Sequence, residues 1–99
     1  MPEHLKKTDF DPYVNETFTV HSPIIGNQEV VLAELTEKNY PGQECFSVIF
    51  RGPEQPVMQQ MLYILTHPKM GEFLLFMVPV HYPAQDGVYY QSVFNRITE

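Results

Sequence analysis

The side chains that could carry chemistry in this sequence are few. The metal-ligating candidates are four histidines: His4, His21, His67 and His81. None of them falls in the His-x-His, His-Glu-x-x-His or His-x-Glu spacing that places two ligands on one surface. His21 and His81 each follow a valine at the end of a predicted strand, and they could meet if those strands pair. Because a protein metal site needs three or four ligands, we expect no bound metal and no cofactor.

The candidates for covalent catalysis are equally sparse. Cys45 is the only cysteine, and it begins a predicted strand beside Phe46, a position typical of a small core or edge residue rather than a reactive thiolate. The sequence has no Gly-x-Ser-x-Gly motif. Its five glycines are spread one to a predicted turn, so no glycine-rich phosphate loop is present. We therefore expect the protein not to be an enzyme.

His67 is placed by its neighbours in a turn. It stands in "LTHPKMG" between two apolar runs, where Pro68 fixes φ and Gly71 can adopt the left-handed conformation that ends the turn. The sequence predicts a partly exposed histidine that caps local backbone. A Gly71→Val change should then damage folding more than His67→Ala.

The tyrosines are the most suggestive candidates for binding. Tyr82, Tyr89 and Tyr90 cluster around the last predicted hairpin, and a wider aromatic set would also include Tyr40, Tyr63 and Phe46. Such a cluster could anchor a protein interface or stack on a sugar. The more ordinary interpretation, cross-strand aromatic pairs that stabilise a small sheet, is favoured. Tyr82, Tyr89 and Tyr90 are the predicted binding residues under the first interpretation.

The elements that must position these residues are strands. Apolar residues recur with a period of two in runs that turn-forming residues separate. We predict strands over 17–20, 29–38, 44–51, 59–66, 72–80 and 88–97, although 59–66 could also form a helical turn. The run "EFLLFMVPV" is apolar on both sides of its alternation, which predicts a central strand covered on both faces.

These strands predict the fold and its domain organisation. We expect one all-β domain over residues 1–99: a compact antiparallel β-barrel or sandwich of about six strands, built mostly of sequential hairpins. Residues 1–12 are predicted to form an irregular N-terminal arm. A hydrophobic content of 43% is enough for one core without disulfides or a structural metal.

The net charge of the chain and its expected cellular location limit the classes of partner that it could bind. Six Lys and Arg residues against twelve Asp and Glu give a net charge of −6, the wrong sign for binding nucleic acid or an anionic membrane. The opening residues "MPEHLKKTDFDP" lack the apolar segment of a signal peptide, and no run is long enough to span a membrane. A lone cysteine fits a reducing compartment, so we expect a cytoplasmic protein.

Four segments together resemble a known family. They are "YVNETFTV" at 13–20, "FSVIFRGP" at 46–53, "LTHPKMGEFLLFMVPV" at 65–80 and "YYQSVFNR" at 89–96. In this order they are similar to a family of small bacterial domains of unknown function. The resemblance implies assembly or accessory work, because such domains are often encoded beside phage-tail-collar-like proteins. It supplies no catalytic residues.

The sequence thus leads to two main hypotheses of function, and a metal-dependent enzyme ranks third. The first is a non-enzymatic protein-binding or assembly module, linked to phage-tail-like proteins, whose partner is another protein or a second copy of the chain. The alternative is a small-ligand or carbohydrate-binding domain that uses the tyrosine cluster. A cleft with convergent polar groups would favour the alternative, and an exposed apolar patch or sheet edge would favour the first.

Overall fold

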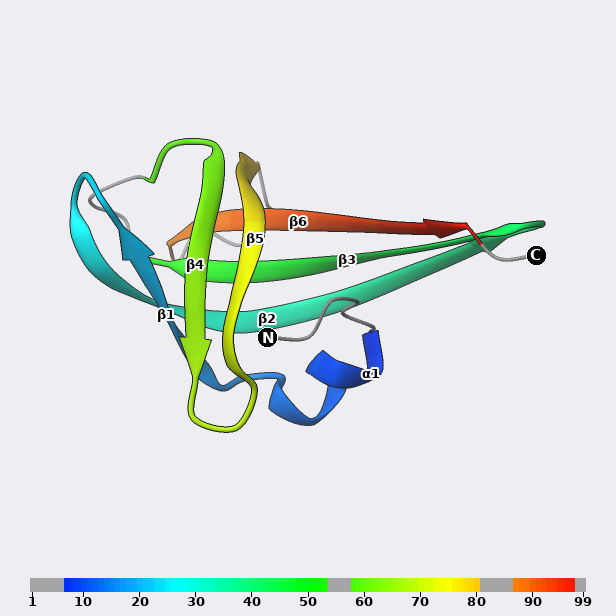
Figure 1. Ribbon diagram of the computed structural model, residues 1–99, viewed down its shortest axis with the longest axis horizontal. Helices are drawn as coiled ribbons and strands as arrows, with labels where there is room; N and C mark the ends of the chain where they lie inside the picture. The colour runs from blue at the N-terminus through cyan, green and yellow to red at the C-terminus, as the bar shows by residue number, and fades with distance from the viewer. Residues whose placement is uncertain (1–6, 54–57, 81–86, 98–99) are drawn as a thin grey trace.

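The chain folds as a closed six-stranded antiparallel barrel (Figure 1). The computed structural model describes residues 7–53, 58–80 and 87–97. Its elements are α1 (Lys7–Phe10), the 3₁₀ turn η1 (Asp11–Tyr13), β1 (Thr17–Ser22), β2 (Gly26–Tyr40), β3 (Gln43–Gly52), β4 (Met61–His67), β5 (Gly71–Val80) and β6 (Val88–Ile97). The strands pair in the order β1-β2-β3-β6-β5-β4, and β4 returns to β1. The predicted all-β fold is confirmed, in its barrel form.

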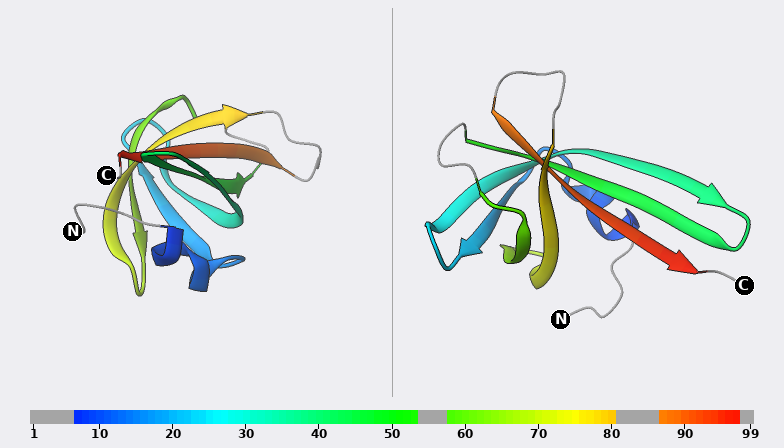
Figure 2. Two further views of the ribbon diagram at one scale, coloured as in Figure 1. Left: turned by 90° about the vertical axis from the view of Figure 1, so that its right-hand side faces the viewer. Right: turned by 90° about the horizontal axis from the view of Figure 1, so that it is seen from above.

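The barrel closes through two short seams. β1 pairs with β4 only over residues 19–21 and 64–66, and β5 pairs with β6 only over residues 78–80 and 89–91. In contrast, β3 pairs with β6 along its whole length. The β4–β5 hairpin therefore crosses the long strands at a steep angle, and β2, β3 and β6 continue beyond the barrel as a three-stranded arm (Figures 1 and 2).

Turn residues set the hairpins. The β2–β3 hairpin reverses at Pro41-Gly42, where Gly42 has φ of 78°, the value that the second central residue of a type II turn requires. The β4–β5 hairpin ends at Gly71, which has φ of 80°. Both positions were predicted from the sequence, because only a residue without a side chain adopts this conformation at no steric cost.

The core follows from strand alternation. Every second residue of β4 and β5 points inward, so that Tyr63 and Leu65 face Leu75 and Phe73 across the hairpin, and all four are buried. Phe18, Val30 and Phe50 complete the opposite wall and are fully buried. One contiguous hydrophobic cluster fills the barrel.

The N-terminal segment corrects one prediction. Residues 7–13 are helical rather than irregular, and Phe10 is fully buried. Its ring lies 5.9 to 6.3 Å from the rings of Phe46, Phe73 and Phe94, which belong to β3, β5 and β6. Phe10 therefore packs where β5 and β6 separate, a long-range role that a short polar stretch of sequence does not reveal. Residues 1–6, the rest of the predicted arm, lie outside the described residues.

Among the described residues, none of the helical segments has the length and hydropathy needed to cross a membrane.

Candidate functional site

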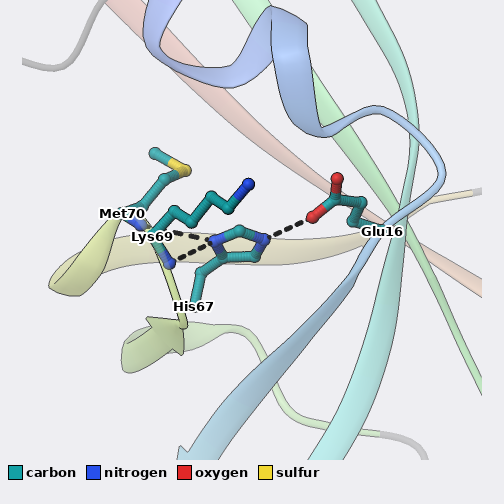
Figure 3. A network of polar contacts seen from close by, with 4 residues as sticks. All are labelled: Glu16, His67, Lys69 and Met70. Atoms are coloured by element: carbon teal, nitrogen blue, oxygen red, sulfur yellow. Dashed lines mark hydrogen bonds and ion pairs between the residues drawn. The ribbon is translucent and has the colours of Figure 1, made fainter.

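His67 lies inside the barrel at the end of β4, and both of its ring nitrogens are hydrogen-bonded (Figure 3). Nδ1 accepts from the backbone N–H groups of Lys69 and Met70, at 3.1 and 3.3 Å. Nε2 lies 2.8 Å from Oε1 of Glu16. Because two N–H donors face Nδ1, the ring proton of the neutral imidazole must sit on Nε2, which donates to the carboxylate.

A tight turn places Glu16 beside His67. Glu16 N donates to the Tyr13 carbonyl at 3.0 Å, Val14 is extended, and Asn15 has φ of 74°. These values define a type II turn, and asparagine is one of the few residues that tolerate its left-handed position. Two backbone hydrogen bonds to Leu32, from Asn15 N and to Glu16 O, tie the turn to β2.

Aromatic rings enclose the imidazole. The ring of Tyr13 lies 4.5 Å from that of His67, and the ring of Phe18 lies 4.6 Å away. The His67 side chain is 2% exposed, whereas that of Glu16 is 49% exposed. With both ring nitrogens hydrogen-bonded and the ring almost fully buried, His67 joins the β4–β5 turn to the entry of β1 through Glu16, and the exposed part of the pair is the Glu16 carboxylate.

The prediction for His67 is therefore half right. The histidine does cap local backbone in the turn, but it is buried rather than partly exposed. The reason is its register: His67 is the last inward-facing residue of β4, after Tyr63 and Leu65. Glu16 was missed because its pairing with His67 is long-range, and only the turn-forming Asn15 before it gave a local signal.

His21 forms a second polar network, which is partly exposed. Its Nδ1 lies 3.0 Å from Asn27 Oδ1, and its Nε2 lies 2.9 Å from Thr66 Oγ1. These bonds bridge β2, β1 and β4 on the outer surface. Within the part of the chain that the structure describes, no three His, Cys, Asp or Glu residues gather as metal ligands. His81, considered above as a partner for His21, lies outside the described residues, as does His4.

Two of the three predicted binding tyrosines are not on the surface. Tyr90 is fully buried and Tyr89 is 5% exposed, so neither side chain presents the predicted exposed anchor. Tyr90 faces inward on β6, and its hydroxyl accepts from Met58 N at 2.9 Å. Gly52 leaves room for it, because a Cβ there would lie 3.1 Å from the Tyr90 ring. Tyr82, the third predicted binding residue, lies outside the described residues.

Tyr90 and Tyr63 instead fix the chain before β4. The Tyr63 hydroxyl donates to the Gln59 carbonyl at 2.6 Å, next to the Met58 amide that Tyr90 holds. Burial raises the pKa of both phenols above the usual value, and the nearby Tyr90 raises the pKa of Tyr63 further. These hydroxyls hold neighbouring backbone in place inside the barrel, which agrees with the more ordinary, structural interpretation of the aromatic residues.

The outer face of the β4–β5 hairpin is where apolar side chains do reach solvent. Leu62 pairs with Phe76, and Ile64 pairs with Leu74. These four side chains are 53%, 49%, 40% and 44% exposed, respectively. We call them the outer apolar face.

A third strand widens this face. Val93, 53% exposed, points outward from β6. Its neighbour Ser92 donates a hydrogen bond of 2.9 Å to the Phe76 carbonyl, which holds the two strands together beyond their paired residues. The apolar surface thus continues from the β4–β5 hairpin toward the three-stranded arm of β2, β3 and β6.

The outer apolar face overturns the prediction that β5 is covered on both sides. Its inward residues Phe73, Leu75 and Met77 are buried, but its outward residues Leu74 and Phe76 are not. The alternation of apolar residues on both sides was read correctly. What it cannot reveal is whether a second layer lies over the outer side, and among the described residues none does.

The comparisons with known proteins can now be stated. Residues 5–94 match the family described as "Domain of unknown function (DUF6916)". The chain belongs to this family. No curated protein and no solved structure matches it. The family extends from just before α1 into β6, so it includes the His67 network and the outer apolar face alike.

Proposed function

We propose that this domain is a non-enzymatic protein-binding module that docks an assembly partner on its outer apolar face. The observation that supports this proposal is the pair of cross-strand contacts Leu62–Phe76 and Ile64–Leu74, whose side chains are about half exposed. Apolar groups exposed side by side on a rigid sheet mark interaction surfaces far more often than scattered single ones do. Their location on a closed barrel keeps the face fixed before the partner arrives.

The resemblance noted in the sequence suggests which partner to test first. Domains of this kind are expected beside phage-tail-collar-like proteins, so a component of a tail-like assembly is the proposed partner. A cytoplasmic location, where such assemblies are built, is part of the proposal. The single free cysteine, Cys45, fits that reducing compartment.

The alternative, a ligand or carbohydrate site built from tyrosines, has less support. Tyr89 and Tyr90 are buried, so they offer no stacking surface. A shallow, open depression lies elsewhere, lined by residues of β2 and β3 that include Glu29 and Arg51. Among the described residues, no exposed aromatic side chain lines this depression, although sugar sites usually carry one.

The test is co-expression with the products of neighbouring genes. The tagged domain is purified as wild type and as the double variant Leu74→Ser/Phe76→Ser, with Tyr40→Ser as the matched control. Tyr40 is 53% exposed but lies at the tip of the arm, on another part of the surface. We expect a stoichiometric partner with the wild type and with the control, and its loss with the double variant.

Two outcomes would contradict the proposal. A partner that binds the double variant as well as the wild type would remove the outer apolar face from the mechanism. If no neighbouring product co-purifies and a sugar raises the melting temperature, the ligand-binding alternative would replace it. Circular dichroism of each variant must first show an intact fold.

A further inference from the structure

The backbone under the outer apolar face restricts what can dock there. Residues 64–66 of β4 pair with β1 on one side and β5 on the other, so their N–H and C=O groups are already used. An extended peptide laid on this face would find no ladder to join, and its own backbone groups would lose water without compensation. Strand addition requires a free sheet edge, and a peptide added along β5 before Val78, where β5 is not paired with β6, would lie beside this face rather than over it. A helix, whose backbone is hydrogen-bonded internally, carries no such cost.

The dimensions of the face also suit a helix. Exposed residues two positions apart on one strand, such as Leu62 and Ile64, are separated by about 6.6 to 6.8 Å. Residues i and i+4 on one side of a helix are separated by about 6 Å. A helix with apolar residues at i, i+3, i+4 and i+7 would therefore cover Leu62 and Ile64 on β4 and Leu74 and Phe76 on β5.

Charge at the rim indicates the polarity of the partner. Beyond the apolar rows, the next outward row of the sheet runs from Glu29 through Thr19 and Thr66 to Glu72. Carboxylates therefore end this row on both sides, and Lys69 in the adjoining turn is the nearby basic residue. The whole chain carries a net charge of −6. A partner with basic residues flanking its apolar stripe would be attracted, and an acidic one repelled.

From these features we infer that the partner of the outer apolar face is a basic amphipathic helix. The helix lies over β4 and β5, with its apolar stripe on Leu62, Ile64, Leu74 and Phe76 and with Lys or Arg residues directed toward Glu29 and Glu72. This inference rests on the proposed function and goes beyond it by naming the chemistry and secondary structure of the partner. It would complete a sheet with a helix on its open side, a stable layered arrangement.

Two synthetic peptides of equal composition test the inference. Both contain only leucine and lysine over about 14 residues; one spaces leucine at i, i+3, i+4 and i+7 to form an amphipathic helix, and the other alternates leucine with lysine to form a strand. Binding is measured by fluorescence anisotropy against the wild type, Leu74→Ser/Phe76→Ser, Glu72→Gln and Tyr40→Ser. Circular dichroism of the mixture reports the bound conformation of the peptide.

The helical peptide should bind the wild type and gain helicity on binding. The double serine variant should weaken it by about tenfold or more, as loss of central apolar anchors does at protein interfaces. Glu72→Gln should weaken it by a smaller factor that disappears at high salt. Tyr40→Ser should change nothing. The alternating peptide should bind at least about tenfold more weakly than the helical one.

The opposite results separate this inference from the proposed function. Equal or tighter binding of the alternating peptide, lost in the double serine variant, would overturn the helical partner but leave a protein-binding face. Binding of both peptides that the serine changes do not affect would reduce the interaction to net charge and overturn the helix inference at this face. No binding of the helical peptide would overturn the inference as well.

Discussion

The two faces of the β4–β5 hairpin are opposites in chemistry and in completeness. The inner face carries His67 and Tyr63, the residues that look reactive, and their polar atoms are hydrogen-bonded within the chain. No described buried side-chain nitrogen or oxygen atom lacks a partner. The outer face carries Leu62, Ile64, Leu74 and Phe76, which look like core residues and are about half exposed. The face whose side chains are left uncovered is therefore the one without polar groups.

This contrast gives a rule for small barrels of this kind. A buried polar group is costly unless it is paired, so folding itself selects a partner for each one. An exposed apolar group has a much smaller cost and can be left for another molecule to cover. In such a domain, a histidine whose ring nitrogens are both hydrogen-bonded has a structural role, and a contiguous exposed apolar face is the candidate that we propose for binding.

The largest expected difference between the two faces is tested by replacing two adjacent leucines of β5. Leu75 is 2% exposed and faces inward, whereas Leu74 is 44% exposed and faces outward. We expect Leu75→Ala to lower the free energy of unfolding by about 2–5 kcal/mol and Leu74→Ala by less than about 1 kcal/mol. Urea denaturation of both variants measures the difference. Similar losses would mean that the outer face is covered in the native protein and that the comparison fails.

Replacement of His67 should cause the next largest loss of stability. Replacing it with alanine removes a buried ring packed between Tyr13 and Phe18, and it leaves the amides of Lys69 and Met70 without their acceptor. We expect a loss of about 2–4 kcal/mol in the same urea experiment. Ile64→Ala, on the same strand but on the outer face, is the control and should cost well under half as much. A loss below about 0.5 kcal/mol would restore the exposed turn histidine predicted from the sequence.

Gly71 is expected to have a smaller effect, which reverses the order that the sequence predicts. Its φ of 80° disfavours any β-branched residue, but a Cβ there would meet no atom within 4 Å. Gly71→Val should therefore cost only the backbone strain, about 1–3 kcal/mol, and Gly71→Asn should cost less because asparagine tolerates this conformation. Thermal melts of the two variants rank them. An equal loss for both would show that φ is not the cause.

The sequence supports most of this architecture because its signals are local. Alternation located all six strands, and the glycines of "NYPGQ" and "HPKMG" located two of the reversals. The N-terminal arm was predicted to be irregular because Phe10 is a single apolar residue among polar ones. Its burial depends on rings from three distant strands.

The sites were harder to predict because they depend on tertiary position. Alternation places Tyr90 on one side of β6 and Tyr89 on the other, but it does not say that both sides are covered there. The same pattern made β5 look like a central strand, although its outward residues are exposed. The Glu16–His67 pair joins residues 51 positions apart, so no local spacing could reveal it.

The smallest expected effect concerns alkaline pH, and it separates the two faces by titration alone. The outer apolar face has no ionisable group, whereas the interior holds the Tyr63 and Tyr90 hydroxyls, whose pKa values burial raises above the usual value of about 10. Above that pH the unfolded chain loses these protons more readily than the folded one, so the unfolded state binds fewer protons. The free energy of unfolding should then be fully retained below about pH 10 and fall as the pH rises through the folded pKa values. Urea unfolding from about pH 8 to 11 measures the slope.

Tyr63→Phe should flatten this dependence of the free energy of unfolding on pH, and Phe76→Ser, which changes no ionisable group, should leave it as in the wild type. If Tyr63→Phe keeps the full slope, the buried phenol is not what alkaline pH acts on, and the inner face is less sealed than its hydrogen bonds imply.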